Sequence, residues 1–279
     1  MTGSAGELGK YVTKELIENG YEVVGTDLRL PGKLDYKFIL SDLTDLGQVH
    51  GCMVGADAVI HLGAIRSPGG QPNEIVFGNN VLSTFNVLEA AANLGLKKVV
   101  FASSINVLGF GFATKYFLPK YMPIEEYHPL LPQDCYGLSK VVGEEICAAC
   151  TRRTGMPTIS LRFMWITYSE LYSKNLPVMW KDPANGRSSL WSYIDGRDAA
   201  NSCRLSLEAE VDGHEAFFIA AEDTYMKIPT MDLIRDFLPE ISDFRRDIPG
   251  TSSIFDCSKA KRLLSFHPAY HWKDHFNPS

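Results

Sequence analysis

A tyrosine and a lysine four positions apart, Tyr136 and Lys140 in the segment YGLSK, have the side chains needed for proton transfer. Residues i and i+4 share one face of a helix, so the ammonium group can approach the phenol oxygen and stabilise its ionised form. A phenol ionises near pH ~10 in water and needs such a cation to act as a base at neutral pH. The pair alone also fits a helix surface with a tyrosine and a solvated lysine, so other residues must decide.

Two serines, Ser103 and Ser104, end an apolar segment, KKVVFASS at 97–104. The carboxyl ends of parallel strands form the edge of a sheet where ligands bind. A hydroxyl group at this edge can hydrogen-bond a substrate oxygen beside Tyr136. The serines and the Tyr/Lys pair together predict general acid/base chemistry at a hydroxyl or carbonyl group.

Three glycines near the amino terminus, Gly3, Gly6 and Gly9 in TGSAGELG, have the spacing G-x-x-G-x-x-G. The first allows a tight turn, the second lets the backbone approach a pyrophosphate, and the third lets a helix pack closely on a sheet. The helix that begins near Glu7 and Leu8 then directs its N–H groups and positive dipole end at the phosphates. The segment therefore predicts a phosphate-binding turn.

Asp27 ends the next apolar segment, YEVVGTD at 21–27. A carboxylate at this place can accept hydrogen bonds from the ribose hydroxyls of adenosine, which indicates a dinucleotide. Its negative charge repels a 2′-phosphate and favours NAD over NADP. Arg29 has the opposite effect and leaves NADP open.

Short segments rich in valine and isoleucine alternate with segments of helical periodicity. Strands buried on both faces and separated by helices indicate a parallel sheet with crossover helices. The alternation predicts an α/β fold with a doubly wound, Rossmann-like sheet. The predicted strands lie at 21–27, 57–63, 97–104 and 158–163, and the predicted helices at 12–19, 77–93 and 137–154.

The glycine-rich turn should follow a strand, yet only Met1 precedes it in the sequence. We therefore expect the fold to lack its first strand here, with a natural chain that begins earlier as one explanation. A valine commonly precedes such a turn, and a valine codon can be misread as a start. Loss of a central strand would leave backbone groups unpaired beside the cofactor and weaken its binding.

The regular alternation ends after residue 163. We expect a dinucleotide-binding domain at 1–163 and a mixed region at 164–279. In the mixed region, 164–192 and 222–279 are expected to form a small substrate-binding cap, the first part rich in loops and the second with short helices. Residues 193–221 are expected to supply the last strand and helix of the core. The cap aromatics fit either a pocket lining or a packed interior.

Composition excludes several classes of protein. The net charge of −6 and the sequence pI of about 5.7 provide no general attraction to nucleic acid or to anionic lipid. No apolar run approaches the ~20 residues of a membrane span, and no basic and apolar leader is present, so we expect a cytoplasmic protein. The six scattered cysteines indicate reduced thiols.

Potential metal ligands fit structural roles better. Cys147 and Cys150 form a single C-x-x-C inside a predicted helix, whereas a zinc site needs about four ligands. Three histidines fall four apart in HPAYHWKDH at 267–275, but Pro268 interrupts the helix that would align them. We expect no bound metal. His61 and Asp195 are expected to serve as a hydrogen-bonded strand residue and a helix cap.

The ordered set of motifs resembles the extended short-chain dehydrogenase/reductase family. Two further segments, LRF at 161–163 and WSYIDGRDAA at 191–200, extend the likeness to its NAD-dependent epimerase/dehydratase branch and to most of the chain. The motifs are TGSAGELG, Asp27, SDL at 41–43, HLGA at 61–64, NNV at 79–81, ASSINVLG at 102–109 and YGLSK at 136–140.

Carried over position by position, the resemblance implies a catalytic set of Ser104, Tyr136 and Lys140. Ser104 is preferred over Ser103 because it stands five residues before Gly109, as the family's serine or threonine does. Tyr136 would be the general base in oxidation and the general acid in reduction. The implied cofactor-binding residues are Gly3, Gly6, Glu7, Leu8, Gly9, Asp27, Asp42, Leu43, Leu62, Gly63, Ala64, Asn80, Tyr136 and Lys140.

The sequence departs from the family where a substrate would bind. MWITYSELYSK replaces an asparagine-containing segment ending in Y-G-P, Leu108 replaces a tyrosine, and Cys135 precedes the catalytic tyrosine. Only 28 residues separate Phe163 from Ser192, and a nucleotide diphosphate needs room and cations. The cap cations are Lys174, Lys181 and Arg187.

The resemblance implies hydride transfer at a carbinol carbon, and the short cap favours a small sugar, uronate or hydroxy-carbonyl compound over a nucleotide sugar as the substrate. A nucleotide-sugar epimerase or dehydratase with a non-exchanging NAD is the first alternative, and a non-catalytic dinucleotide sensor is the second. By analogy with the family, the helices at 77–93 and 137–154 can pair in a homodimer. We expect a small-molecule substrate, and no nucleic acid or membrane, as partner.

Overall fold

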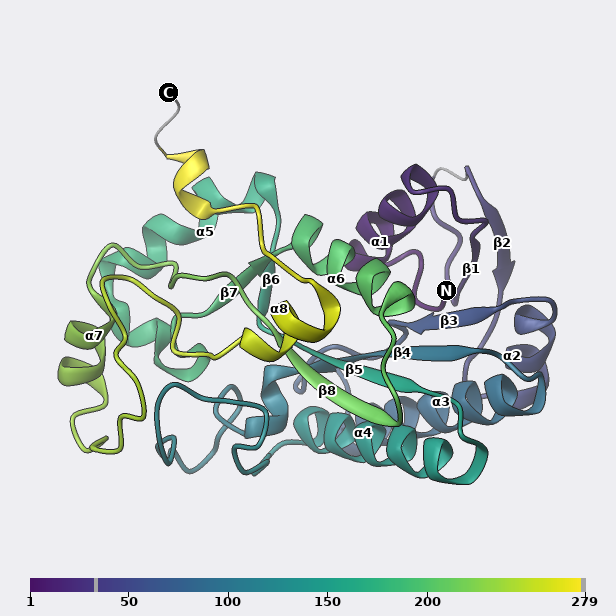
Figure 1. The fold of residues 1–279 in the computed structure, drawn as a ribbon, viewed down its shortest axis with the longest axis horizontal. Coiled ribbons are helices and arrows are strands. Elements are labelled where there is room, and N and C mark those ends of the chain that lie inside the picture. The colour runs from purple at the N-terminus through teal and green to yellow at the C-terminus, as the bar shows by residue number, and fades with distance from the viewer. Residues whose placement is uncertain (33–34, 277–279) are drawn as a thin grey trace.

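The computed structural model describes residues 1–32 and 35–276, and Figure 1 shows their arrangement. The strands are β1 (Val24–Asp27), β2 (Lys37–Leu40), β3 (Ala58–His61), β4 (Lys98–Ser104), β5 (Thr158–Phe163), β6 (Trp165–Thr167), β7 (Tyr193–Asp195) and β8 (His214–Ile219). The α-helices are α1 (Glu7–Glu18), α2 (Leu46–Met53), α3 (Asn73–Asn93), α4 (Cys135–Thr154), α5 (Ser169–Lys181), α6 (Gly196–Glu208), α7 (Thr230–Phe237) and α8 (Ser258–Leu264), and the 3-10 helices are η1 (Ile105–Leu108), η2 (Pro183–Ser189) and η3 (Trp272–His275).

The main sheet is parallel. Strands β3, β4, β5 and β8 form one hydrogen-bonded set in that order, and β1 pairs with β2. Met1 and Thr2 join the two sets, because Thr26 N–H donates to the Met1 carbonyl at 2.9 Å and Thr2 N–H donates to the Ile60 carbonyl at 3.0 Å. A two-residue bridge therefore lies at the central position where the sequence predicts that a full strand is missing.

Helices cover both faces of this sheet (Figure 1). Helices α3 and α4 pack side by side on one face, and α1 packs against α6 on the other. The central strands β4 and β5 are buried on both faces, with Val99, Val100, Ile159 and Leu161 at 0% exposure. The continuous apolar runs thus serve as inner strands of a helix–sheet–helix sandwich, which confirms the predicted Rossmann-like α/β fold.

The cap differs from the predicted loop-rich segment. Residues 169–181 form helix α5, which buries Tyr172 and Leu176, four positions apart, on one face. The sequence obscured this helix because Pro177 lies inside it and aromatic residues flank it. Strands β6 and β7 form a small separate parallel pair beneath it.

The cap aromatics mainly fill its interior. Tyr172, Trp191 and Tyr193 have no exposed surface. The Tyr172 hydroxyl donates to Asp195 Oδ2 at 3.1 Å, and the Tyr193 hydroxyl donates to Asp223 Oδ1 at 2.9 Å. These rings therefore stabilise the cap by packing, with their polar ends satisfied. In the part of the chain that the structure describes, no helix is both long and apolar enough to cross a membrane.

Candidate active site

The glycine turn lies between Thr2 and α1 and is held by close backbone contacts. Gly3 has a φ of +70°, and a Cβ atom there would lie 2.7 Å from the Gly63 nitrogen. A Cβ atom on Gly9 would lie 2.3 Å from the Gly3 carbonyl oxygen. Around Gly6, by contrast, the nearest atom is that same oxygen at 3.3 Å. Gly3 and Gly9 are therefore required by the fold, whereas Gly6 keeps the space before α1 open.

Asp27 lies at the carboxyl end of β1, next to this turn. Its Oδ2 accepts a hydrogen bond from the Ala5 N–H at 3.1 Å, and its Oδ1 accepts one from the Arg29 N–H at 3.3 Å. The turn and the carboxylate, which the sequence predicts to act together, are thus in direct contact. Gly6 is the N-cap of α1 and has no side chain to occupy the first N–H groups of the helix, at Glu7 and Leu8.

The segment after β3 borders the same turn. Gly63 N–H donates to Thr2 Oγ1 at 3.2 Å, and a Cβ atom on Gly63 would lie 2.4 Å from Leu43 Cδ1. Leu43, Gly63 and the neighbouring Leu62 and Ala64 are therefore gathered at the glycine turn. Asp42 differs, because its Oδ1 accepts two hydrogen bonds from Thr44 and so supports the start of α2.

Asn80 on α3 is buried and links this segment to α4. Its Oδ1 accepts from the Ile65 N–H at 2.8 Å, and its Nδ2 donates to the Ile65 carbonyl at 2.9 Å. The same Nδ2 donates to Ser139 Oγ at 3.1 Å, and the Ser139 hydroxyl donates to the Tyr136 carbonyl at 2.7 Å. Asn80 thereby fixes the position of the α4 turn that carries Tyr136 and Lys140.

Ser104 and Tyr136 meet where β4 ends and α4 begins. Ser104 Oγ accepts from the backbone N–H of Asn106 at 3.2 Å and from its Nδ2 at 3.1 Å, which caps η1. Burial raises the pKa of Tyr136, and the neighbouring Ser104 hydroxyl acts in the opposite direction. Ser103 points elsewhere and donates to Glu144 at 2.6 Å. This geometry supports the choice of Ser104 over Ser103.

Lys140 is buried in the floor of the same site. Its Nζ donates to the Ala102 carbonyl at 2.7 Å and lies 5.7 Å from the centroid of the Tyr136 ring. Burial lowers the pKa of Lys140 to about 8, and the nearby Cys147 and Glu144 oppose that change. The ammonium group is thus beside the phenol but bound to the end of β4.

Two residues that the sequence analysis did not select also face Tyr136. Phe112 packs edge-on against the Tyr136 ring, with centroids 6.3 Å apart. The Arg66 guanidinium is exposed, and its charge acts to lower the pKa of both Tyr136 and Tyr168. Arg66 follows HLGA by two residues, so a cation just after this cofactor-side segment was a usable signal. Phe112 lies in an aperiodic loop that gave none.

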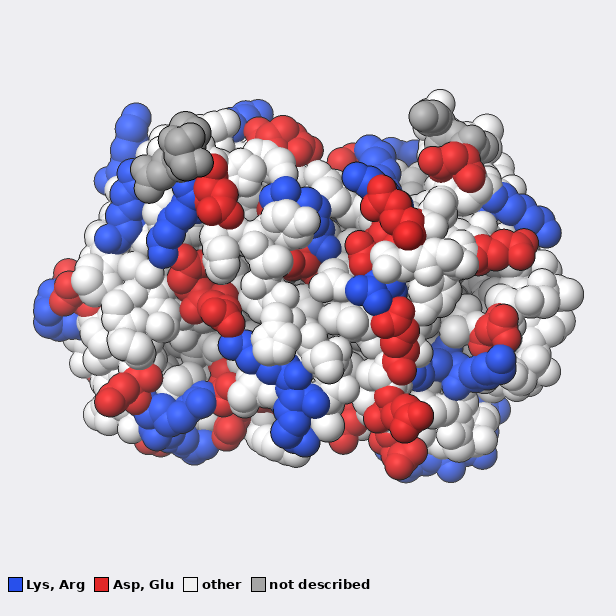
Figure 2. Space-filling view, turned by 45° about the horizontal axis from the view of Figure 1, so that its top comes forward, with Lys and Arg blue, Asp and Glu red and all other residues white. Residues whose placement is uncertain are grey.

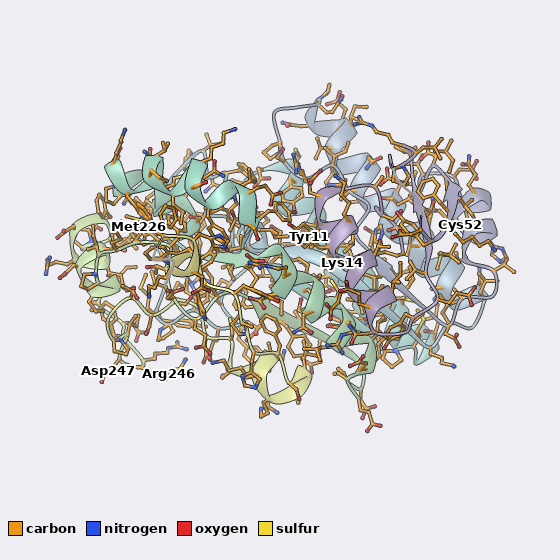
Figure 3. All side chains as sticks on the ribbon, turned by 90° about the horizontal axis from the view of Figure 1, so that it is seen from above. Tyr11, Lys14, Cys52, Met226, Arg246 and Asp247 are labelled. Atoms are coloured by element: carbon orange, nitrogen blue, oxygen red, sulfur yellow. The ribbon has the colours of Figure 1, made fainter. Side chains whose placement is uncertain are left out.

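Helix α1, which follows the glycine turn, also borders the cap. Tyr11 on α1 lies near the middle of the molecule (Figure 3), and its ring stacks on Tyr168 at the start of α5 with centroids 5.1 Å apart. A separate hollow of about 290 Å³ lies in the cap beside Arg246 and Asp247, at the far end from Cys52 (Figure 3). Its cations are neutralised, because Arg246 pairs with Asp256 and Lys261 pairs with Glu222.

The residues that we expected to have structural roles are buried or make hydrogen bonds within the fold. His61 is buried, with Nδ1 2.7 Å from Thr2 Oγ1 and Nε2 3.2 Å from Thr84 Oγ1. Cys147 and Cys150 are buried in α4. Asp195 caps α6 through the Arg197 N–H at 2.9 Å. Within residues 1–32 and 35–276, no group of three potential ligands is arranged to hold a metal ion.

Known proteins show the same combination of fold and motifs. The chain is 33% identical over 165 residues to the uronate dehydrogenase of Pseudomonas syringae pv. tomato, an alignment that covers 58% of this chain and 57% of that protein. It is 32% identical over 203 residues to a putative UDP-glucose 4-epimerase of Methanocaldococcus jannaschii, with 70% of this chain and 61% of that protein covered. The matched region thus spans less than two thirds of either relative.

A solved structure and a family profile complete the comparison. A short-chain dehydrogenase/reductase superfamily protein from Agrobacterium tumefaciens, crystallised with bound NAD, superposes with a TM-score of 0.75 at 24% identity, covering 98% of this chain and 93% of that one. Residues 1–217 match the profile of the NAD dependent epimerase/dehydratase family. This match confirms the predicted family. The chain belongs to the NAD-dependent epimerase/dehydratase family.

Proposed function

We propose that this protein is an NAD-dependent dehydrogenase that oxidises a carbinol carbon of a small sugar acid, with Ser104, Tyr136 and Lys140 as its catalytic residues. The observation that carries the proposal is their assembly at the carboxyl end of β4. Ser104 adjoins the buried Tyr136 and acts to lower its pKa, and the Lys140 ammonium lies 5.7 Å from the centroid of the tyrosine ring. Asn80 fixes this turn of α4 relative to Ile65 in the segment after β3.

The residues around the glycine turn fit a dinucleotide. Gly6 leaves open space at the amino terminus of α1, where N–H groups and the helix dipole can bind a pyrophosphate. Asp27 is oriented by Ala5 at the edge of the turn and can accept from ribose hydroxyls. The proposed binding set also includes Gly3, Glu7, Leu8, Gly9, Asp42, Leu43, Leu62, Gly63, Ala64 and Asn80. When bound, NAD accepts the hydride that the substrate carbon releases.

The chain's own groups would handle the proton. The Ser104 hydroxyl orients the substrate oxygen, and the Tyr136 phenolate removes the proton from that oxygen. Burial raises the pKa of Tyr136, so cations must offset this cost. The Lys140 ammonium below the ring and the Arg66 guanidinium at the rim supply positive charge on two sides.

A sugar acid is favoured over a nucleotide sugar. Arg187 of η2 lies over the Tyr116 ring, 3.7 Å from its centroid, and its buried Nε has no hydrogen-bond partner among the described residues. Tyr116 belongs to the same loop as Phe112, which contacts Tyr136. We propose that Arg187 binds the substrate carboxylate. The uronate dehydrogenase of Pseudomonas syringae is a relative that acts on such a compound, as its name states.

A second candidate function is epimerisation or dehydration of a nucleotide sugar, with NAD reduced and reoxidised within one turnover. The similarity to a putative UDP-glucose 4-epimerase favours it. The two functions use similar sites and differ in net chemistry. Accumulation of NADH during turnover identifies a dehydrogenase, whereas product formation without NADH identifies an epimerase or dehydratase.

The surface fits a cytoplasmic enzyme of small molecules. Figure 2 shows Lys and Arg interspersed with Asp and Glu over the visible face, without the one-sided basic field that nucleic acid attracts. All six cysteines are free thiols, as expected in a reducing compartment. We further propose a homodimer formed through α3 and α4, whose shared outer surface carries exposed apolar side chains.

The proposal is tested by cofactor titration followed by a substrate assay. Calorimetry should show tight binding of NAD and weak binding of NADP, and uronates should then give NADH. Tyr136→Phe should keep NAD affinity and lose about two to four decades of kcat, because the variant lacks the acid/base group. Tyr127→Phe, at an 84% exposed tyrosine, serves as the control. Retained activity in Tyr136→Phe would refute the assignment.

A further inference from the structure

A buried ion pair lies behind the proposed catalytic residues. Glu144 on α4 and Arg162 on β5 have side chains only 7% and 6% exposed. Arg162 Nη2 donates to Glu144 Oε2 at 2.7 Å, and Arg162 Nε donates to Glu144 Oε1 at 2.9 Å. This two-point geometry fixes both side chains.

The remaining polar groups around the pair are also satisfied. The Ser103 hydroxyl donates to Glu144 Oε1 at 2.6 Å, and Arg162 Nη1 donates to the Glu126 carbonyl at 2.8 Å. Glu126 in turn accepts from the Phe218 N–H of β8 at 2.9 Å. The pair thus ties β4, α4 and β5 together and, through Glu126, β8, with at least one hydrogen bond at each guanidinium nitrogen and each carboxylate oxygen.

The free energy of folding alone does not explain why the chain buries this ion pair. Removing two charges from water costs several kcal/mol per ion, and an apolar pair of the same size is often as stable or more so. Buried charges that are fully bonded instead fix one arrangement of the surrounding elements. The place of this pair therefore indicates what it serves.

The pair adjoins the proposed site at two points. Glu144 follows Lys140 by one helical turn on α4, and its partner Ser103 directly precedes Ser104 on β4. Lys140 Nζ binds the carbonyl of Ala102, the residue before Ser103. One carboxylate consequently connects the strand end that carries the serine with the helix that carries the lysine.

The charges facing Lys140 make Glu144 its main negative neighbour. On α4, Cys147 and then Glu144 are the groups that act to raise the pKa of Lys140 against burial. Burial raises the pKa of the Cys147 thiol, so the thiol carries no charge where Lys140 titrates. His61 faces Lys140 from β3. Burial lowers the pKa of His61 to about 3, so its ring is neutral. Glu144 itself is faced by Arg162 from β5, Ser103 from β4, and His214 of β8, whose pKa burial also lowers.

We propose that Glu144 is a positioning residue of this site, which holds the end of β4 against α4 and keeps the Lys140 ammonium charged beside Tyr136. The proposal rests on the proposed function for its catalytic meaning. Arg162 has the complementary role of pairing with the Glu144 carboxylate and holding it in one orientation.

The test uses Glu144→Gln, which keeps the size of the side chain and removes its charge. Loss of the negative charge lowers the pKa of Lys140, so the ammonium is lost at a lower pH. The high-pH limb of the kcat/KM profile should move to lower pH by at least about half a unit, equal to a factor of about three in the charged fraction. Glu145→Gln, at the exposed neighbour on the same helix, should leave the limb unchanged.

Further variants separate charge from structure. Glu144→Asp should lower kcat but keep the limb near its original pH, because the carboxylate is retained. The double variant Glu144→Gln with Arg162→Met removes both charges and should return the limb toward that of the wild type. A Glu144→Gln profile lowered by one constant factor at every pH would show a merely structural role and overturn the proposal.

A second measurement does not depend on turnover. NMR of isotope-labelled lysine side chains, with the Lys140 signal assigned through Lys140→Arg, follows the titration of Lys140 directly. Its midpoint should lie lower in Glu144→Gln than in the wild type, and equal midpoints would overturn the proposal. Failure of the proposed function would appear separately, as a wild type without NADH formation or an unaffected Tyr136→Phe variant.

Discussion

Single side chains in this protein differ mainly in how far the fold removes them from water. His61 lies at the end of β3 and Lys140 near the start of α4, and both basic side chains are buried in the same region. Burial lowers the pKa of both. For Lys140 the lowered pKa has a proposed use, because a neighbouring charge can change the protonated fraction of an ammonium group that is near its pKa. For His61 the two hydroxyl partners satisfy a neutral ring.

His61 should make the protein sensitive to acid. Burial lowers its pKa from 6.5 to about 3, with the Lys140 charge adding to the effect. Above pH 6.5 the ring is neutral in both states, and as the pH falls toward 3 only the unfolded state gains the proton, so the free energy of unfolding decreases. Between pH 7 and 5 the expected loss is about 2 kcal/mol, measured by urea denaturation.

The matched variants are His61→Asn and His267→Gln. His61→Asn should remove this part of the pH dependence, whatever it does to stability at pH 7. His267 is exposed, so its replacement should leave the pH dependence as in the wild type. If His61→Asn loses stability between pH 7 and 5 as steeply as the wild type does, the histidine is not the group responsible.

At the scale of elements, two glycines of the glycine turn have different roles: Gly9 is needed for packing, and Gly6 for the proposed ligand binding. A methyl group on Gly9 would lie 2.3 Å from the Gly3 oxygen and 2.8 Å from the Ser4 carbonyl carbon, both backbone atoms. Gly9→Ala should therefore lower the free energy of unfolding by about 1–3 kcal/mol. A methyl group on Gly6 would have one close contact, 3.3 Å from the Gly3 oxygen, which a shift of a few tenths of an ångström relieves, and it would project into the space proposed for the pyrophosphate.

Gly6→Ala should consequently keep its melting temperature within a few degrees and weaken NAD binding at least tenfold, about 1.4 kcal/mol. Calorimetric titration and thermal unfolding of the same samples measure both effects. Gly51→Ala on α2, where the new methyl group meets no atom within 4 Å, is the control and should bind NAD normally. Unchanged NAD affinity in Gly6→Ala would place the pyrophosphate elsewhere.

The sequence predicted the elements whose patterns are local. β4 and β5 are continuous apolar runs, and α4 has apolar residues at helical spacing, so their types followed from periodicity. α5 was missed because a proline and aromatics obscured its period. The Glu144–Arg162 pair was beyond prediction, since it joins a helix and a strand whose register only the folded sheet defines.

The candidate site also contains residues that local patterns predicted and residues that they did not predict. The glycine turn with Asp27 and the YGLSK segment were visible as spacings within one segment. Phe112 reaches Tyr136 from a separate loop, and no spacing in the sequence records that approach. Arg66 reaches it from another loop, where its place two residues after HLGA was the only signal. Site residues were therefore predictable where one segment carries them and unpredictable where loops converge.

At the scale of the whole molecule, the two helices that carry Asn80 and Tyr136 also present an apolar surface to solvent. On α3, Ile75, Leu82 and Phe85 are 45–49% exposed at helical spacing, and Leu138 on the adjacent α4 is 44% exposed. Gly78 lies on the same face, and a Cβ atom there would meet nothing. Exposed apolar side chains that gather on one face can mark a contact with another protein.

We therefore expect a homodimer at micromolar concentration that pairs α3 and α4 of one protomer with those of its partner. Phe85→Glu places a charge in the centre of that face and should give monomers, as measured by sedimentation or light scattering, because an unpaired charge cannot be buried at the interface. Val178→Glu, at a 59% exposed position on α5, should remain dimeric. Asn80 and the Tyr136 turn lie on the inner side of these helices, so loss of NAD affinity on dissociation would show that dimer contacts hold the site in place, and a wild type that is monomeric throughout would exclude this face as an interface.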